Sequence, residues 1–151
     1  MDKRAAELRQ NIRGAKVERV GEGIQVTFDS GLMFDVDSDA LRTEARTNLG
    51  ELAKSFDKYD DSDIMIVGHT DNTGTESHNA DLSIRRADAA AGFLVNRGVS
   101  GKRIRTLGLG EMEPIASNES DDGRQENRRI EVAIYASKDM QEAARKKAGG
   151  S

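Results

Sequence analysis

The chain contains no cysteine among its 151 residues. This absence excludes disulfides, thiolate nucleophiles and cysteine-ligated zinc, but it leaves the cellular compartment open. No stretch approaches the roughly 18–20 consecutive apolar residues that a bilayer-spanning helix needs, so we expect no membrane span within this chain. Residues 1–4 are not followed by an apolar stretch either, and no secretory signal is predicted.

Metal ligands are also scarce. His69 and His78 are the only histidines, and without cysteine they make a weak zinc site. The aspartates of residues 35–39 imitate the start of a calcium-binding EF-hand loop. That pattern fails at Ala40, where glycine is required, and at Arg46, where glutamate is required. We therefore expect no metal and no cofactor.

The composition is polar, with 36% hydrophobic and 33% charged residues and a mean hydropathy of −0.68. The formal net charge of −4 disfavours a general electrostatic attraction to nucleic acid. Apolar residues nevertheless gather in periodic segments, which favours a folded core over disorder. We expect one domain over residues 24–136. An N-terminal helix and the start of a hairpin (residues 1–23) precede it, and a polar, flexible tail (residues 137–151) follows it.

The hydrophobic pattern predicts strands alternating with helices. Strands are predicted at residues 16–20, 24–28, 64–67, 105–109 and 128–136. Helices are predicted at residues 2–13, 41–56, 76–97 and 124–127, with one further helical turn at 100–104. Loops are predicted at residues 68–74 and 110–123, which are rich in glycine and polar turn formers. This alternation indicates an α/β fold, a two-layer α/β sandwich with helices packed on one face of a mixed sheet.

Local signals refine three of these elements. Ser38 or Asp39 is placed to cap the helix over residues 41–56, and Gly98 occupies the left-handed position expected after the helix that ends near residue 97. Residues 29–31 read as a turn. Either residues 24–28 or the apolar segment 32–34 is expected to join the three later strands in one sheet.

Five motifs follow one another between Leu32 and Val132. They are Phe34-Asp35, Gly68-His69-Thr70-Asp71 with Gly74, Asn79-x-x-Leu82-Ser83-x-x-Arg86-Ala87, Gly108-x-Gly110-Glu111 with Pro114, and Asn127-Arg128-Arg129-Ile130-Glu131. In this order they resemble the OmpA-like domain, the peptidoglycan-binding module of outer-membrane proteins and lipoproteins. The upstream hairpin resembles the lipoprotein branch. The resemblance implies a βαβαβ-type fold and a non-catalytic periplasmic module that tethers an outer-membrane-associated protein to the cell wall.

The resemblance also implies a ligand and a site. Family members bind the peptide stem of peptidoglycan, commonly through meso-diaminopimelate, whose side chain ends in an ammonium and a carboxylate on one carbon. Asp71 is suited to the ammonium and Arg86 to the carboxylate, which a guanidinium holds as a planar fork. By motif position Asn79, Arg128 and Asp37 complete the site, while Thr73 and Leu82 line it. The family often has a neutral polar residue where Asp37 stands.

Structural roles are open for several of these residues. Asp71 could serve as a turn residue, or it could form an ion pair with Arg86 that a ligand would separate. Arg128 could be a surface residue of its strand, and Arg129 could pair with an acidic helix residue. Phe34 is expected in the core.

Two other functions are open as well. A peptidoglycan-cleaving enzyme would need a carboxylate pair, and no pair is singled out by the sequence. A protein-interaction module of the cell envelope would keep the fold but use another surface, such as the helix at residues 2–12 or the hairpin tip at residues 21–23. The intact motif positions favour peptidoglycan binding.

Overall fold

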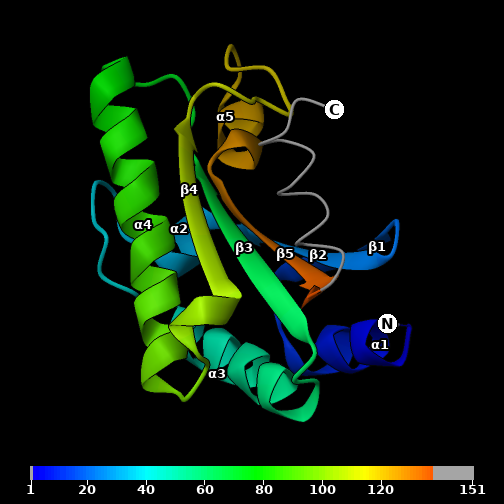
Figure 1. The fold of residues 1–151 in the computed structure, drawn as a ribbon. Coiled ribbons are helices and arrows are strands. Elements are labelled where there is room, and N and C mark those ends of the chain that lie inside the picture. The colour runs from blue at the N-terminus through cyan, green and yellow to red at the C-terminus, as the bar shows by residue number, and fades with distance from the viewer. Residues whose placement is uncertain (1, 138–151) are drawn as a thin grey trace, which may run out of the picture.

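The structure is a computed structural model that describes residues 2–137, and its frame is a five-stranded mixed sheet (Figure 1). The strands lie in the order β1–β2–β5–β3–β4. Their bounds are β1 (Ala15–Val20), β2 (Gly23–Asp29), β3 (Ser62–His69), β4 (Ile104–Gly110) and β5 (Arg129–Ala136). The pair β3–β4 is parallel and the other neighbours are antiparallel. The predicted mixed sheet is confirmed, and of the two expected partners the strand at residues 24–28 joins it.

One face of the sheet forms the core. Val132 in β5 lies between Val26 of β2 and Ile66 of β3, and all three side chains are buried. Alternate residues of the same strands point to the opposite face and are half-buried, as in Thr27 and Met65. Because successive side chains of a strand point to opposite faces, this alternation places the main apolar layer on one side only.

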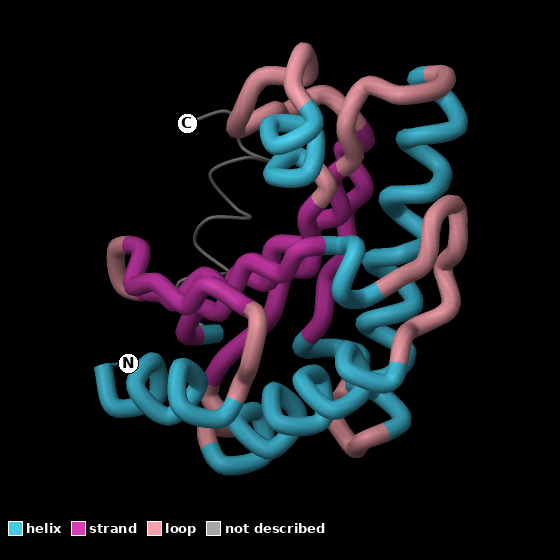
Figure 2. The backbone as a smooth tube through the Cα atoms, turned by 180° about the vertical axis from the view of Figure 1, so that it is seen from behind, coloured by secondary structure: helices cyan, strands magenta, loops and turns pink. Residues whose placement is uncertain are grey.

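Three long helices cover that face. They are α1 (Asp2–Asn11), α3 (Thr43–Lys58) and α4 (Glu76–Asn96). Each contributes residues to the cluster that contains Ile66 and Val132, for example Leu8, Leu52 and Leu94. Helix α4 runs along β3 and β4, while α3 contacts both α4 and α1 (Figures 1 and 2). The prediction of helices on one face is therefore confirmed, and α1 belongs to the same core.

Helix α4 lies unusually close to the sheet because two glycines face it. A Cβ atom added to Gly68 of β3 would overlap the carbonyl oxygen of Ser83, and one added to Gly108 of β4 would overlap the backbone of Ile84. Ser83 also accepts from the backbone N–H of Gly110 at 3.0 Å, through its hydroxyl oxygen. The contact fixes the N-terminal half of α4 against the ends of β3 and β4.

The chain between β2 and α3 differs from the prediction. Residues 32–34 do not form a sheet strand, and residues 29–31 are not a separate turn. Instead the short helix α2 (Ser30–Met33) follows its N-cap Asp29, whose carboxylate accepts from the N–H of Gly31 at 2.8 Å. Helix α3 begins at Thr43, and neither Ser38 nor Asp39 caps it. An isolated bridge between Phe34 and Leu41 closes residues 35–40 into a loop that lies against α4 instead. That tertiary contact overrides the local capping signal.

The remaining predictions are met closely. Gly98 has a φ of 100° after α4, the helical turn is η1 (Gly101–Arg103), and the predicted short helix is α5 (Asp121–Asn127). The long loop before α5 is held by Asn127, whose amide oxygen accepts from the N–H groups of Ile115 and Ala116 at 2.8 and 2.9 Å. Of the predicted tail at residues 137–151, residues 138–151 lie outside the described residues. Within residues 2–137, none of the helices combines the length and the apolar character that crossing a bilayer requires.

Candidate ligand-binding site

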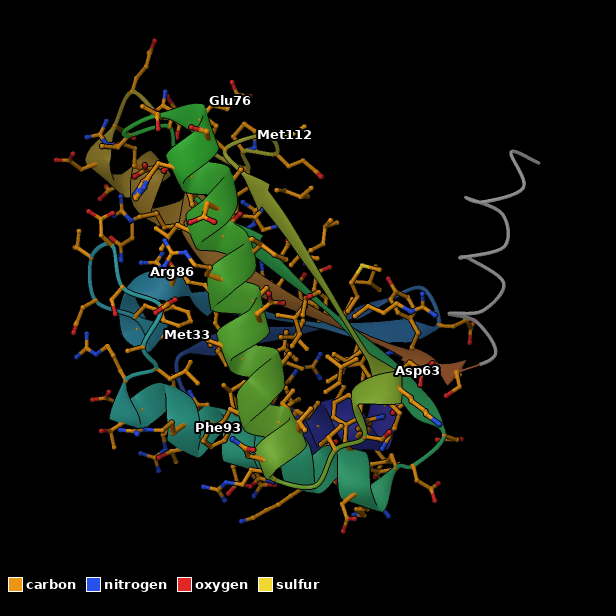
Figure 3. The ribbon with its side chains drawn as sticks, turned by 60° about the vertical axis from the view of Figure 1, so that its left-hand side comes forward. Met33, Asp63, Glu76, Arg86, Phe93 and Met112 are labelled. Carbon is orange, nitrogen blue, oxygen red and sulfur yellow. The ribbon has the colours of Figure 1, made fainter. Side chains whose placement is uncertain are left out.

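The predicted site residues gather at one end of the sheet. The strands β3 and β4 end there, β5 begins there, and α4 starts with Glu76 at the same end (Figures 1 and 3). Three loops meet beside them, namely residues 35–40, 70–75 and 111–120. The fold thus brings together segments that are far apart in the sequence.

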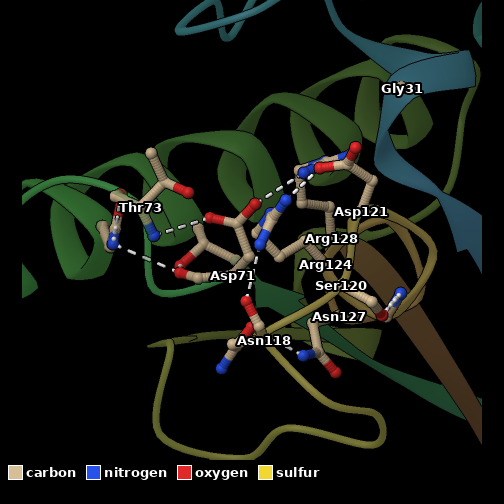
Figure 4. Close-up of polar contacts among 12 residues, drawn as sticks. Gly31, Asp71, Thr73, Asn118, Ser120, Asp121, Arg124, Asn127 and Arg128 are labelled. Carbon is tan, nitrogen blue, oxygen red and sulfur yellow. Dashed lines mark hydrogen bonds and ion pairs between the residues drawn. The ribbon is translucent and has the colours of Figure 1, made fainter.

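Asp71 is fixed by two hydrogen bonds and is only 6% exposed. Its Oδ1 accepts from the backbone N–H of Thr73 at 2.8 Å, and its Oδ2 accepts from Nη1 of Arg128 at 2.5 Å (Figure 4). Burial by itself would raise the pKa of Asp71, but the bonds from Thr73 and Arg128 outweigh it and lower the pKa below the ordinary value. Asp71 is therefore a fixed anion at neutral pH.

Asn79 holds the loop that carries Asp71. Its Nδ2 donates to the carbonyl oxygens of Asp71 at 3.3 Å and Thr73 at 3.0 Å. Gly74 takes a left-handed φ of 86°, and Thr75 caps α4 by accepting from the N–H of His78 at 3.2 Å. Asn79 and Thr73 thus shape the loop, with the Asn79 side chain buried beneath it.

Arg86 is a buried cation, 6% exposed. Its Nε donates to the carbonyl oxygen of Ser38 at 2.9 Å and its Nη2 to that of Asp35 at 3.1 Å, and its guanidinium lies 5.0 Å from the centre of the Phe34 ring. No carboxylate of the described residues lies within 4.0 Å of it. Burial lowers the pKa of Arg86 below its ordinary value, although the side chain stays charged at neutral pH.

The loop at residues 35–40 forms the rim of the site. Asp37 has a left-handed φ of 56°, and its Oδ1 lies 3.2 Å from Nε2 of His78 on α4. Asp39 pairs with Arg85 at 3.1 Å. Asp37 is exposed, whereas Leu82, one turn after His78 on α4, is buried. Together with Arg86, these contacts attach the loop to α4 at three points.

The polar contacts differ from the predicted ones in two respects. Asp71 does not pair with Arg86, because Arg128 occupies its Oδ2, so Arg128 is not an unattached surface residue. Arg129 forms no ion pair with an acidic helix residue among residues 2–137, although its Nη1 donates to the backbone carbonyl of Asn127 at the end of α5 at 3.4 Å. It lies 3.3 Å from Glu131 on its own strand and donates to the backbone carbonyl of Glu113 at 3.0 Å. In both cases the partner is set by how β5 enters the sheet beside the loops.

The sequence did not indicate several residues that support the candidate site. Phe34 is in the core, as expected, but it also supports the guanidinium of Arg86. Glu131 belongs to the fifth motif, and within residues 2–137 its carboxylate accepts from none of the predicted site residues. Its Oε1 lies 2.6 Å from Nε2 of the buried His69, directly before the loop of Asp71. The hydrogen bond from His69 lowers the pKa of Glu131 against the effect of burial.

A family model described as the OmpA family matches residues 33–128. The chain belongs to the OmpA family. It is 37% identical over 136 residues to the probable lipoprotein YiaD of Escherichia coli, covering 89% of this chain and 62% of that protein. The chain therefore spans less than two thirds of this curated relative.

A second relative and a solved structure support the assignment of this chain to the OmpA family. The peptidoglycan-associated lipoprotein of Mesorhizobium japonicum is 34% identical, with 86% of this chain and 77% of that protein covered. Among solved structures, the cell wall anchor of the type VI secretion system from Pseudomonas aeruginosa superimposes with a TM-score of 0.78 at 30% identity, covering 87% and 96% of the two chains. The predicted OmpA-like α/β fold is thus confirmed. Over residues 2–137 no group of three or more potential acidic or histidine ligands is arranged to hold a metal ion.

Proposed function

We propose that this OmpA-family domain binds the peptide stem of peptidoglycan without covalent attachment, through the side-chain ammonium and carboxylate of meso-diaminopimelate. The observation that carries the proposal is the buried Arg86, whose charge is held in place by backbone carbonyls and has no carboxylate partner within 4.0 Å among residues 2–137. Asp37 and Asp39 act on the charge of Arg86 only from beyond 4.0 Å, and burial still outweighs them, so a ligand carboxylate in direct contact with Arg86 would be stabilised. Asp71 supplies the fixed anion for the ammonium.

The other predicted residues have supporting roles in this proposal. Asn79 and Thr73 hold the loop of Asp71 in shape, and Leu82 forms part of the base. Arg128 orients Asp71 until the ammonium replaces it. Asp37 adds a second carboxylate at the rim, which favours a cationic group.

The relatives support the same partner. The names of the Mesorhizobium lipoprotein and the Pseudomonas secretion-system protein describe association with peptidoglycan and anchoring to the cell wall. We therefore propose that residues 24–136 form the peptidoglycan-binding domain of an outer-membrane-associated protein, exposed to the periplasm, where it tethers that protein to the wall.

We further propose that binding leaves peptidoglycan intact. Asp71 is held by the backbone N–H of Thr73 and the guanidinium of Arg128, and neither of these groups is a nucleophile or a general base. Incubation of purified sacculi with the protein should release no soluble muropeptides. Release that disappears with one acidic substitution would overturn this part of the proposal.

Co-sedimentation with purified sacculi tests the binding itself. Wild type should sediment with the sacculi, whereas Asp71→Ala and Arg86→Ala should each bind about tenfold to a hundredfold more weakly, because one charge-assisted hydrogen bond contributes roughly 1.5–3 kcal/mol. Glu51→Ala removes a half-buried acid on α3 that pairs with Lys54, away from the site, and should bind like wild type. Circular dichroism must show that each variant is folded. If both site variants sediment like wild type, the site is wrong and a protein-interaction module becomes the better reading.

A further inference from the structure

A cavity of about 620 Å³ adjoins the candidate site, and Arg86 is not part of its lining. It lies between the β1–β2 strand pair, α5 and the loop before α5. Its lining includes Lys16, Thr27, Ile115, Asp122, Glu126 and Arg128. Arg128 is common to both places, because it lines this cavity and also donates to Oδ2 of Asp71. The cavity and the candidate site are therefore neighbours that share one wall.

The walls of the cavity are held in place. Gln125 of α5 donates to Oδ2 of Asp29 at 2.9 Å, which joins α5 to the end of β2. The N–H of Ile115 donates to the buried Asn127, so this residue is anchored by its backbone while its side chain is 60% exposed. The cavity is thus formed by fixed elements before any ligand arrives.

The lining is chemically mixed. Ile115 and the methyl group of Thr27 offer apolar contacts. Lys16 offers a cation, although it also lies 3.5 Å from the exposed Glu18. Asp122 and Glu126 stand one turn apart on α5, and neither has an ion-pair partner among residues 2–137. Such a lining suits a short peptide with small side chains, amide groups and a carboxylate better than it suits a purely apolar or purely anionic ligand.

We propose that this cavity binds the stem residues that flank diaminopimelate. The inference rests on the proposed function: Arg128 contacts Asp71 and also lines the cavity, so a stem whose diaminopimelate is bound at Asp71 and Arg86 has the cavity beside it. The volume falls within the roughly 300–1,000 Å³ typical of ligand pockets and exceeds what one terminal ammonium and carboxylate would fill. Alanine methyl groups of the stem would contact Ile115 and Thr27, and a stem carboxylate would face Lys16.

Calorimetry with two ligands separates this proposal from the proposed function. The first ligand is meso-diaminopimelate blocked by acetylation and amidation at its backbone end, so that only the side-chain ammonium and carboxylate remain free. The second is the tetrapeptide L-Ala–γ-D-Glu–meso-diaminopimelate–D-Ala. Wild type should bind the tetrapeptide at least tenfold more tightly, as expected for one or two added hydrogen bonds and apolar contacts.

Thr27→Trp should fill the cavity and remove this tenfold advantage, while the affinity for blocked diaminopimelate stays within twofold of wild type. Ile115→Asp, at an exposed side chain, should reduce the advantage without threatening the fold. Val20→Trp is the matched control, because Val20 is an exposed strand residue outside the cavity lining. It should keep the full advantage.

The possible results point to different conclusions. If wild type binds both ligands equally, or if folded Thr27→Trp and Ile115→Asp keep the advantage, the cavity proposal is overturned while diaminopimelate binding stands. If wild type binds neither ligand, the proposed function fails and the cavity proposal fails with it.

Discussion

Replacing Arg86 by lysine keeps the positive charge but removes the planar fork, and the structure allows the effect to be worked out. The guanidinium has five N–H groups. Two of them are used by the carbonyl oxygens of Ser38 and Asp35. Three remain, which is enough to meet both oxygens of a ligand carboxylate. A lysine ammonium has three N–H groups in all, so it cannot hold both carbonyls and both carboxylate oxygens.

Arg86→Lys should therefore lose at least one charge-assisted bond to the ligand. Such a bond contributes about 1.5–3 kcal/mol, so the dissociation constant for blocked meso-diaminopimelate should rise roughly tenfold to a hundredfold. The free energy of unfolding should fall by about 1–2 kcal/mol, because the loop at residues 35–40 loses part of its attachment to α4. Calorimetric titration and urea unfolding measure the two effects.

Arg85→Lys is the matched control for this change. Arg85 is the neighbour of Arg86 on α4, but it is more exposed and pairs with Asp81 and Asp39. Its replacement should change ligand affinity by less than about twofold, as expected for surface ion pairs. The second control changes the ligand: when its side-chain carboxylate is amidated, wild type and Arg86→Lys should bind it equally weakly. Equal affinity of folded Arg86→Lys and wild type for the unmodified ligand would refute the reasoning.

Four further substitutions test the packing of the fold. Gly108→Ala should destabilise the domain by more than about 2 kcal/mol in urea unfolding because its Cβ would overlap α4, whereas Gly92→Ala, which meets no atom within 4 Å, should stabilise it by about 0.5–1 kcal/mol. Arg4→Ala should cost about 2–4 kcal/mol in the same assay, because it removes a buried side chain that donates from α1 to two serines and stacks on an aromatic ring. Since His69 lowers the pKa of Glu131, their pairing stabilises the fold above about pH 4.3 and loses this effect as the pH falls through the lowered pKa. The difference in unfolding free energy between wild type and Glu131→Gln should therefore shrink in acid.

The elements were predictable where local periodicity and tertiary burial agree. Helix α4 has apolar residues at helical spacing, and strand β3 contains the apolar run at residues 64–67, so both could be read from the sequence within two residues of their ends. The start of α3 could also be placed within two residues, but its N-terminal cap could not be read in this way. Ser38 and Asp39 are good capping residues, but the bridge from Phe34 to Leu41 turns the intervening loop toward α4.

The sequence indicated which residues belong to the candidate site, but it did not indicate which of them contact one another. Arg128 and Asp71 are 57 positions apart, and their pairing depends on how β5 enters the sheet beside the loop. Arg86 is held by backbone carbonyl groups, which every residue possesses, so no residue type marks its partners in the sequence. The resemblance of the motifs could assign these residues to one site, but it could not predict that Asp71 pairs with Arg128 and not with Arg86.

That balance has a consequence for how the ligand would bind. Without ligand, Asp71 is neutralised by Arg128, while Arg86 lacks a carboxylate partner among the described residues. A ligand ammonium must displace Arg128 from Asp71, so its attraction to Asp71 is offset by the ion pair that it breaks. The side chain of Arg128 is 41% exposed and lines the adjoining cavity. After displacement its guanidinium would therefore contact water and lie near the cavity carboxylates of Asp122 and Glu126. The net gain then comes mainly from the carboxylate at Arg86 and from stem residues in the cavity. A ligand with the ammonium alone should therefore bind far more weakly than one with both groups, which is the discrimination that a tether to diaminopimelate-containing walls requires.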